Sequence, residues 1–155
     1  MNKKEMNNKG FSLVELIIVI AIMAILVGAL APQFMKYIER SRQATDIQAA
    51  GTVFTVLTTA YADPDVTEAD KPSGTYTLPT GPSTTNEYDN EVWESLGQKS
   101  PVLKSNAYKA GGFTITLDAN GNFSVKLTSA TTGVPSKIVD ASGSHDDTTT
   151  GGSGS

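Results

Sequence analysis

The longest hydrophobic stretch of the chain runs from Phe11 to Leu30, and only Ser12 and Glu15 within it are polar. A run of about 20 apolar residues forms a helix long enough to cross the hydrocarbon core of a membrane. A carboxylate inside such a helix costs about 2.5–3.5 kcal/mol on insertion scales, so an intramembrane Glu is expected to have a function. The pattern predicts a membrane-spanning helix with one functional carboxylate, Glu15.

A helical pattern resumes after Pro32 and continues to about Ala62 in two apolar stripes. One stripe contains Ile47, Ala50, Phe54, Leu57 and Tyr61, and the other contains Ile38, Thr45, Ala49, Val53, Val56 and Ala60. A single stripe suits a helix that covers one sheet, whereas two stripes suit a helix covered on both sides. We expect one stripe to pack on the chain's own sheet. The other stripe either belongs to the same core or partly faces neighbouring molecules.

Gly28 and Pro32 mark a weak point in this long helix. Proline has no N–H, and its ring crowds the carbonyl four residues earlier, which here belongs to Gly28. Glycine itself is a poor helix former. We therefore expect the segment from Ala24 to Pro32 to bend.

The residues after the helix predict a small set of further elements. Asp63 to Asn86 contains four prolines and two glycines, which indicates a loop with one short strand at Thr75–Leu78. Asn86 or Thr85 can cap a short helix over Glu87–Leu96 that Gly97 closes. We expect this helix to bury Val92, Trp93 and Leu96.

Two segments with strict alternation, Phe113–Leu117 and Phe123–Leu127, flank a turn at Asp118–Gly121 and predict a β-hairpin whose apolar side chains face the helix. Lys137–Val139 is expected to form a third strand. The sequence from His145 to Ser155 has low complexity, which predicts a disordered tail, and Gly151–Ser155 resembles a linker. The expected fold class is α+β.

Composition and charge exclude several classes of protein. The chain has 155 residues and no cysteine, so it has no disulfide, thiolate nucleophile or Cys-ligated metal. From Gln43 onward it has six lysines and thirteen acidic residues, a net charge of −7. An acidic body argues against a nucleic-acid partner, which requires a basic face.

Lys9-Gly10-Phe11-Ser12-Leu13-Val14-Glu15-Leu16, followed by an apolar helix, resembles the processing signal of type IV pilins. The resemblance implies that a prepilin peptidase cuts after Gly10 and N-methylates Phe11, the new N-terminus. It also implies that Glu15 is the assembly carboxylate, which meets the N-terminus of the next subunit. Gly28 and Pro32 then mark a region that can unwind when subunits pack. In lacking cysteine, the chain resembles pilins of Gram-positive or anaerobic bacteria.

The same resemblance implies an organisation and a set of partners. Residues 1–10 are the leader, residues 11–35 the membrane and filament-core half of the helix, and residues 36–62 its amphipathic half. Residues 63–144 are the globular domain, and residues 145–155 the tail. The expected partners are further copies of the chain, the peptidase and methyltransferase, the membrane, and an inner-membrane assembly platform with its ATPase. The precursor is expected in the cytoplasmic membrane with a cytoplasmic N-terminus, and the mature subunit in an extracellular pilus serving adhesion or motility.

Other interpretations of the N-terminal segment remain open at this point. A secretory signal peptide could end at Ala29-Leu30-Ala31, although Pro32 is unfavourable after a cleavage site and the run is too long. A pseudopilin of a secretion or DNA-uptake system would share the signal and the helix. A surface enzyme or binding protein could use the span only as an anchor.

The rest of the sequence offers little catalytic chemistry. His145 beside Asp146 and Asp147 is a poor metal site if that segment is mobile, and Asp118 to Asn122 resembles a calcium loop that lacks the bidentate Glu. A hairpin turn explains the second pattern more simply. No nucleophile–base pair or phosphate-binding loop occurs, so we predict no enzyme activity and no cofactor.

Overall fold

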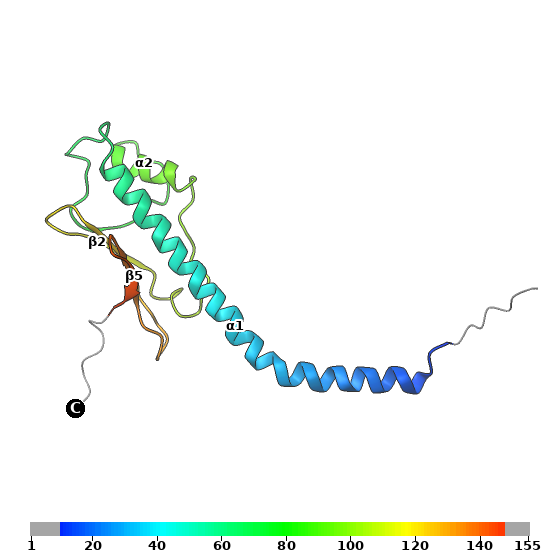
Figure 1. Cartoon of the computed structure of the whole chain (residues 1–155). Helices are drawn as coiled ribbons and strands as arrows, with labels where there is room; N and C mark the ends of the chain where they lie inside the picture. The colour runs from blue at the N-terminus through cyan, green and yellow to red at the C-terminus, as the bar shows by residue number, and fades with distance from the viewer. Residues whose placement is uncertain (1–9, 148–155) are drawn as a thin grey trace, which may run out of the picture. The chain divides into compact units, whose positions relative to one another are not determined.

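One long helix and a five-stranded antiparallel sheet make up most of the structure, a computed structural model that describes residues 10–147 (Figure 1). The elements in chain order are α1 (Leu13–Tyr61), β1 (Gly74–Tyr76), α2 (Glu87–Ser95), β2 (Phe113–Leu117), β3 (Phe123–Leu127), β4 (Lys137–Asp140) and β5 (Gly143–Asp146). The chain divides into two units, one up to Ile38 and one from Glu39 onward. The fold is α+β, as predicted.

The sheet follows chain order, β1-β2-β3-β4-β5, with every neighbouring pair antiparallel. The predicted hairpin is confirmed, with Ile115 opposite Val125 and Leu117 opposite Phe123. Its turn is closed by the Asp118 carboxylate, which accepts the N–H groups of Asn120 at 2.8 Å and Asn122 at 2.9 Å. These bonds lower the pKa of Asp118, those from Asn122 most. Asp118 therefore serves the turn.

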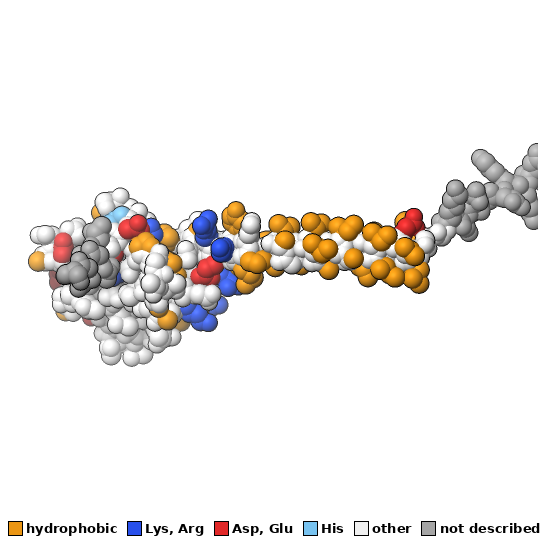
Figure 2. All heavy atoms as spheres, turned by 90° about the horizontal axis from the view of Figure 1, so that it is seen from below, with side chains coloured by type: hydrophobic (Ala, Val, Ile, Leu, Met, Phe, Trp, Pro, Cys, Tyr) orange, Lys and Arg blue, Asp and Glu red, His pale blue; other side chains and the backbone are white. Residues whose placement is uncertain are grey.

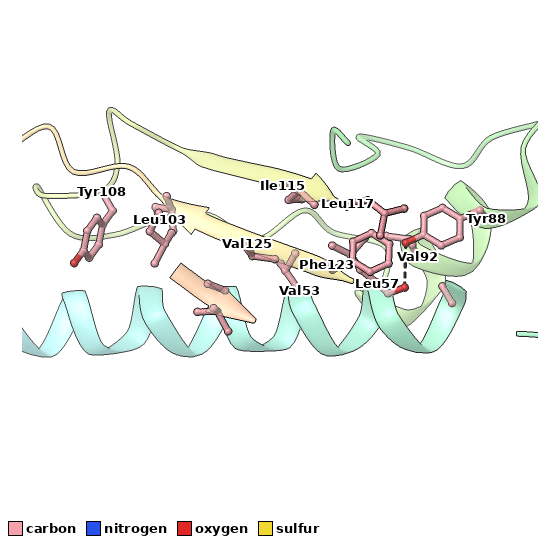
Figure 3. Packing of buried hydrophobic residues seen from close by; sticks show 14 of the residues in the cluster. Val53, Leu57, Tyr88, Val92, Leu103, Tyr108, Ile115, Leu117, Phe123 and Val125 are labelled. Carbon is pink, nitrogen blue, oxygen red and sulfur yellow. Dashed lines mark hydrogen bonds between the residues drawn. The ribbon is translucent and has the colours of Figure 1, made fainter. Parts of the chain in front are cut away.

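The hydrophobic core lies between the sheet and the second half of α1 (Figure 3). The inward faces of the hairpin are buried as predicted: Ile115, Leu117, Phe123, Val125 and Leu127. Helix α1 buries Ala50 and Leu57 from one predicted stripe and Val53 and Ala60 from the other. Because the buried positions come from both stripes, much of the second stripe belongs to the subunit's own core.

Helix α2 begins as predicted but buries a different set of side chains. The Asn86 side chain accepts the N–H of Asp89 at 2.8 Å and so caps the helix. Tyr88 and Val92 are buried, whereas Trp93 and Leu96, which we expected in the core, are only partly covered. The Tyr88 hydroxyl donates to the Leu57 carbonyl at 3.0 Å and thereby joins α2 to α1 (Figure 3). A tyrosine suits this buried position because its hydroxyl can donate a hydrogen bond to a carbonyl of α1.

The prediction of disorder from His145 onward is wrong for its first residues. Gly143–Asp146 forms β5, which pairs with β4 after a turn at Gly143, whose φ is +107°. The next residue, Asp147, is buried, and its carboxylate lies 2.5 Å from the Lys126 ammonium. Pairing with β4 and this ion pair fix the position of a segment that has no hydrophobic alternation. The remaining tail, including Gly151–Ser155, lies outside the described residues.

Other boundaries differ from the expected ones by one or two residues. Helix α1 begins at Leu13 and not at Phe11, because Ser12 begins the helix as its N-terminal cap. The short strand lies at Gly74–Tyr76, where it pairs with β2, and not at Thr75–Leu78. Strand β4 extends the predicted third strand by Asp140.

Candidate functional site

The start of α1 leaves the Gly10–Phe11 peptide outside the helix. Gly10, Phe11 and Ser12 are not helical, and the Phe11 side chain is 95% exposed. No atom lies within 4 Å of the position that a Cβ on Gly10 would occupy, other than its chain neighbours. The two residues that the sequence singles out for cleavage are therefore accessible and lie outside the helix.

Glu15 lies in the first turn of α1 and is held there by the backbone. Its Oε2 accepts the N–H of Ser12 at 2.9 Å, while the Leu16 N–H donates to the Ser12 carbonyl at 3.2 Å. Ser-x-x-Glu at a helix start is the sequence of a capping box, in which the acidic residue satisfies an N–H that the helix leaves free. A carboxylate here also interacts favourably with the positive end of the helix dipole. Within residues 10–147, the Oε1 of Glu15 accepts no hydrogen bond.

The surface of this part of α1 is apolar all round. Figure 2 shows hydrophobic side chains covering its visible face, and every residue from Leu13 to Tyr37 is exposed. Glu15 is the only charged residue between Gly10 and Lys36. By length and composition, α1 is the one helix among the described residues that could cross a membrane. A helix that is hydrophobic on every side must be covered by lipid or by other protein.

Gly28 and Pro32 both lie inside α1, which is helical on either side of them. Pro32 supplies no N–H, so the Gly28 carbonyl lacks its usual helical donor. No atom lies within 4 Å of a Cβ built on Gly28, apart from the helix's own nearby backbone. This turn has one hydrogen bond fewer and an open surface, which makes it the easiest place for the helix to open. Bending and unwinding here stay predictions.

The sequence did not predict the structural role of two carboxylates on α1. Asp46 is 1% exposed, and its two oxygens accept the N–H groups of Lys104 and Ser105, each at 2.8 Å. About two turns earlier, the Oε1 of Glu39 accepts the N–H groups of Asn106 at 2.6 Å and Ala107 at 3.3 Å. Together they tie the loop between α2 and β2 onto the helix. A polar residue between two apolar stripes was the only sequence signal for Asp46.

The sequence predicted no metal centre, and the described residues contain no group of three or more His, Asp or Glu side chains arranged to hold a metal ion. His145 lies in β5, 3.8 Å from the Asp140 carboxylate, and not in a mobile tail.

Comparison with known proteins bears directly on the N-terminal site. Residues 6–31 match the family described as the prokaryotic N-terminal methylation motif, a range that includes Gly10, Phe11 and Glu15. The first part of the chain is therefore similar to the N-terminal methylation motif of prokaryotic proteins. The matched range includes the Gly10–Phe11 peptide, the capping box of Ser12 and Glu15, and much of the exposed apolar helix.

Curated relatives match part of the chain. The chain is 40% identical over 55 residues to type IV major fimbrial proteins FimA of Dichelobacter nodosus. The matched region is 36% of this chain and 35% of the relative in the first of these comparisons. The chain therefore matches about a third of the length of these curated relatives. Comparison with solved structures gives no match.

Proposed function

We propose that this chain is a structural subunit that polymerises into a type IV pilus on the cell surface, without catalytic activity of its own. The observation that carries the proposal is the helix surface that is exposed and apolar on all sides, preceded by a prepilin-type leader and interrupted only by Glu15. A surface of this kind is stable in a bilayer before assembly and against the same helix of other copies afterwards. The matched relatives are fimbrial proteins, which favours a pilus over a pseudopilus.

The proposal includes a route from the membrane to the fibre. The precursor lies in the cytoplasmic membrane with residues 1–10 in the cytoplasm and the globular unit outside. A prepilin peptidase and N-methyltransferase process it, and an assembly platform with its ATPase moves it into the growing filament. Adhesion or motility is the expected use of the fibre.

Processing is expected after Gly10, so the mature subunit begins at N-methyl-Phe11. The small residue before the scissile bond allows close approach of the peptidase backbone. Intact-mass spectrometry of native fibres should give the mass of residues from Phe11 onward plus one methyl group. A fibre subunit that still begins at Met1, or that begins after Ala31, would contradict this proposal.

A pair of variants tests the site itself. Gly10→Val should stop cleavage because a branched side chain then stands at the scissile bond. Gly28→Val places the same side chain in the membrane helix, where it should leave cleavage intact.

Glu15 is proposed to be the assembly carboxylate. Its Oε2 is used by Ser12 of the same chain, which leaves Oε1 to pair with the methylated Phe11 amine of a neighbouring subunit. Opposite charges brought together in a medium of low dielectric constant attract strongly. Glu15→Ala should therefore insert and be cleaved normally, and processed monomer should accumulate in the membrane with few fibres.

Glu15→Gln separates charge from shape, because the amide oxygen can still accept the Ser12 N–H. If charge pairing drives assembly, Gln should fail like Ala when fibres are counted by electron microscopy. Ser12→Ala is the matched control: it removes the other polar side chain of the run but keeps the Ser12 N–H, so fibres should form. Normal fibres from Glu15→Ala would overturn the assembly role.

Gly28 and Pro32 are proposed to let α1 open locally in the fibre. A local loss of helical hydrogen bonds would let the two parts of the helix follow different paths around the filament axis. Pro32→Ala restores the missing N–H, so it should stiffen the helix and alter fibre geometry while leaving processing unchanged. Cryo-electron microscopy of the variant fibre tests this.

A further inference from the structure

Four exposed cationic side chains lie on two segments of the globular unit that hydrogen bonds hold together. Arg40 and Arg42 lie on α1, and Lys104 and Lys109 lie on the loop between α2 and β2; all four are exposed. We refer to these four residues as the basic rim. Figure 2 shows Lys and Arg side chains grouped where α1 enters this unit.

Two carboxylates of α1 hold the loop between α2 and β2, which carries the two lysines, against the part of the helix that carries the two arginines. Asp46 accepts the N–H of Lys104, and Glu39 accepts the N–H groups of Asn106 and Ala107. The segments 39–46 and 104–109 contain no other acidic residue. The only two carboxylates in these segments are therefore bound to backbone N–H groups, and they do not pair with the arginines and lysines.

Within residues 10–147 the rim has no ionic partner. Among residues 10–147, the ion pairs involve Lys71, Lys126, Lys137 and His145, and none includes a residue of the rim. Burial first, and then the charge of Asp146, raises the pKa of Tyr108. Asp146 itself is paired with Lys137. Four exposed cations without partners form an anion-binding surface.

We propose that the basic rim binds anionic phospholipid headgroups of the outer leaflet while the subunit is held in the membrane. Two aromatic residues with exposed side chains, Phe34 and Tyr37, follow the apolar run, and Tyr37 precedes Arg40 by about one helical turn. Aromatic rings next to Lys and Arg are the composition of a membrane–water interface. Basic residues at this level attract anionic lipid within about a Debye length of the surface.

This inference rests on the proposed function, because it requires α1 to span the membrane. It goes further by giving the unassembled subunit a lipid preference and a docked position. Entering the fibre then involves release of these headgroups, so assembly should depend on the anionic lipid content of the membrane. The sequence shows Arg40 and Arg42 after the span, but only the fold adds Lys104 and Lys109 to them.

The test uses the full chain in phosphatidylcholine vesicles that contain spin-labelled phosphatidylglycerol or spin-labelled phosphatidylcholine. Electron paramagnetic resonance gives the fraction of each label held against the protein. We expect phosphatidylglycerol to be preferred by about three- to fivefold at low ionic strength, less in salt. R40Q/R42Q/K104Q/K109Q should lower this preference to the part that Lys36 and the leader lysines supply.

Two controls separate the rim from net charge and from misfolding. R40Q/R42Q and K71Q/K137Q remove the same charge, but only R40Q/R42Q should lower the lipid preference. R40K/R42K keeps the charge and should keep the preference. If the quadruple variant retains the full preference, the proposal is wrong. If fibre yield also falls in that variant, the rim contacts other copies of the chain and not lipid. Extraction with carbonate shows separately whether the chain spans the bilayer, and failure there overturns the proposed function itself.

Discussion

At the scale of single residues, the buried carboxylate of Asp46 has a large effect on the stability of the globular unit. It is almost completely removed from solvent, and both of its oxygens accept backbone N–H groups from residues 58 and 59 positions later in the chain. A carboxylate bound twice in this way stabilises a loop that has no strand or helix of its own. Removing it leaves two donors without an acceptor, one of them on the fully buried Ser105.

Asp46→Ala should therefore lower the free energy of unfolding by about 3 kcal/mol, since each hydrogen bond to a charged group contributes about 1.5–3 kcal/mol. Denaturant unfolding followed by circular dichroism measures this. Asp65→Ala is the matched control, because Asp65 is exposed and its carboxylate makes no hydrogen bond within the described residues. A loss below about 1 kcal/mol for Asp46→Ala would mean that water replaces the carboxylate at the loop.

At the scale of elements, local patterns determined what could be predicted. The β2–β3 hairpin and the Asn86 cap of α2 were predictable because alternation, turn residues and capping residues are neighbours in the sequence. Strand β5 was missed because Gly-Ser-His-Asp has no apolar alternation and is ordered by pairing with β4. The loop contacts of Glu39 and Asp46 were missed because they join residues more than 50 positions apart.

Tyr88 in helix α2 provides a second prediction at this scale. Burial first, and then the charge of Asp89, raises the pKa of Tyr88 above its usual value of 10.0. The unfolded chain therefore loses this proton at lower pH than the folded one. The stability that the neutral phenol supplies is complete below about pH 10 and decreases as the pH rises beyond that.

Tyr88→Phe removes the hydrogen bond to the Leu57 carbonyl and should cost about 1 kcal/mol at neutral pH. Above about pH 10 the variant should lose stability less steeply than the parent protein, because one ionising phenol is gone. Tyr76 shares this behaviour: burial and its hydrogen bond to Asp89 raise its pKa, so the parent protein should keep part of its alkaline sensitivity in the variant. Unfolding curves across this pH range, with ultraviolet absorbance reporting tyrosinate, check both slopes. Parallel slopes for variant and parent would contradict the assignment.

At the scale of the whole molecule, the two units have opposite surfaces. Residues 13–37 of α1 are exposed and mostly apolar, whereas the unit from Glu39 onward encloses a core of its own. The sequence predicted this contrast because the first twenty apolar residues have no polar face and the later helix has a periodic one. The exposed apolar half of α1 needs a covering of lipid or other protein, whereas the unit from Glu39 onward has a hydrophobic core of its own.

The chain from Pro32 onward should therefore fold as a soluble monomer with a cooperative unfolding transition. Analytical ultracentrifugation and thermal unfolding test this, with the full chain in detergent as the reference. The core residues of α1, including Val53 and Leu57, remain in the shortened chain. Aggregation of the fragment, or a gradual transition, would show that the apolar half also supports the globular fold.

The two edges of the sheet have a consequence for how copies of the chain can join. Strand β1 has three residues and β5 has four, and β5 presents Gly, Ser, His and Asp, all exposed. Short, polar edge strands are poor templates for adding a further strand. Growth by strand pairing, the route to amyloid, is therefore disfavoured at both edges of the described sheet, so copies of the chain can be crowded together with little tendency for their sheets to fuse.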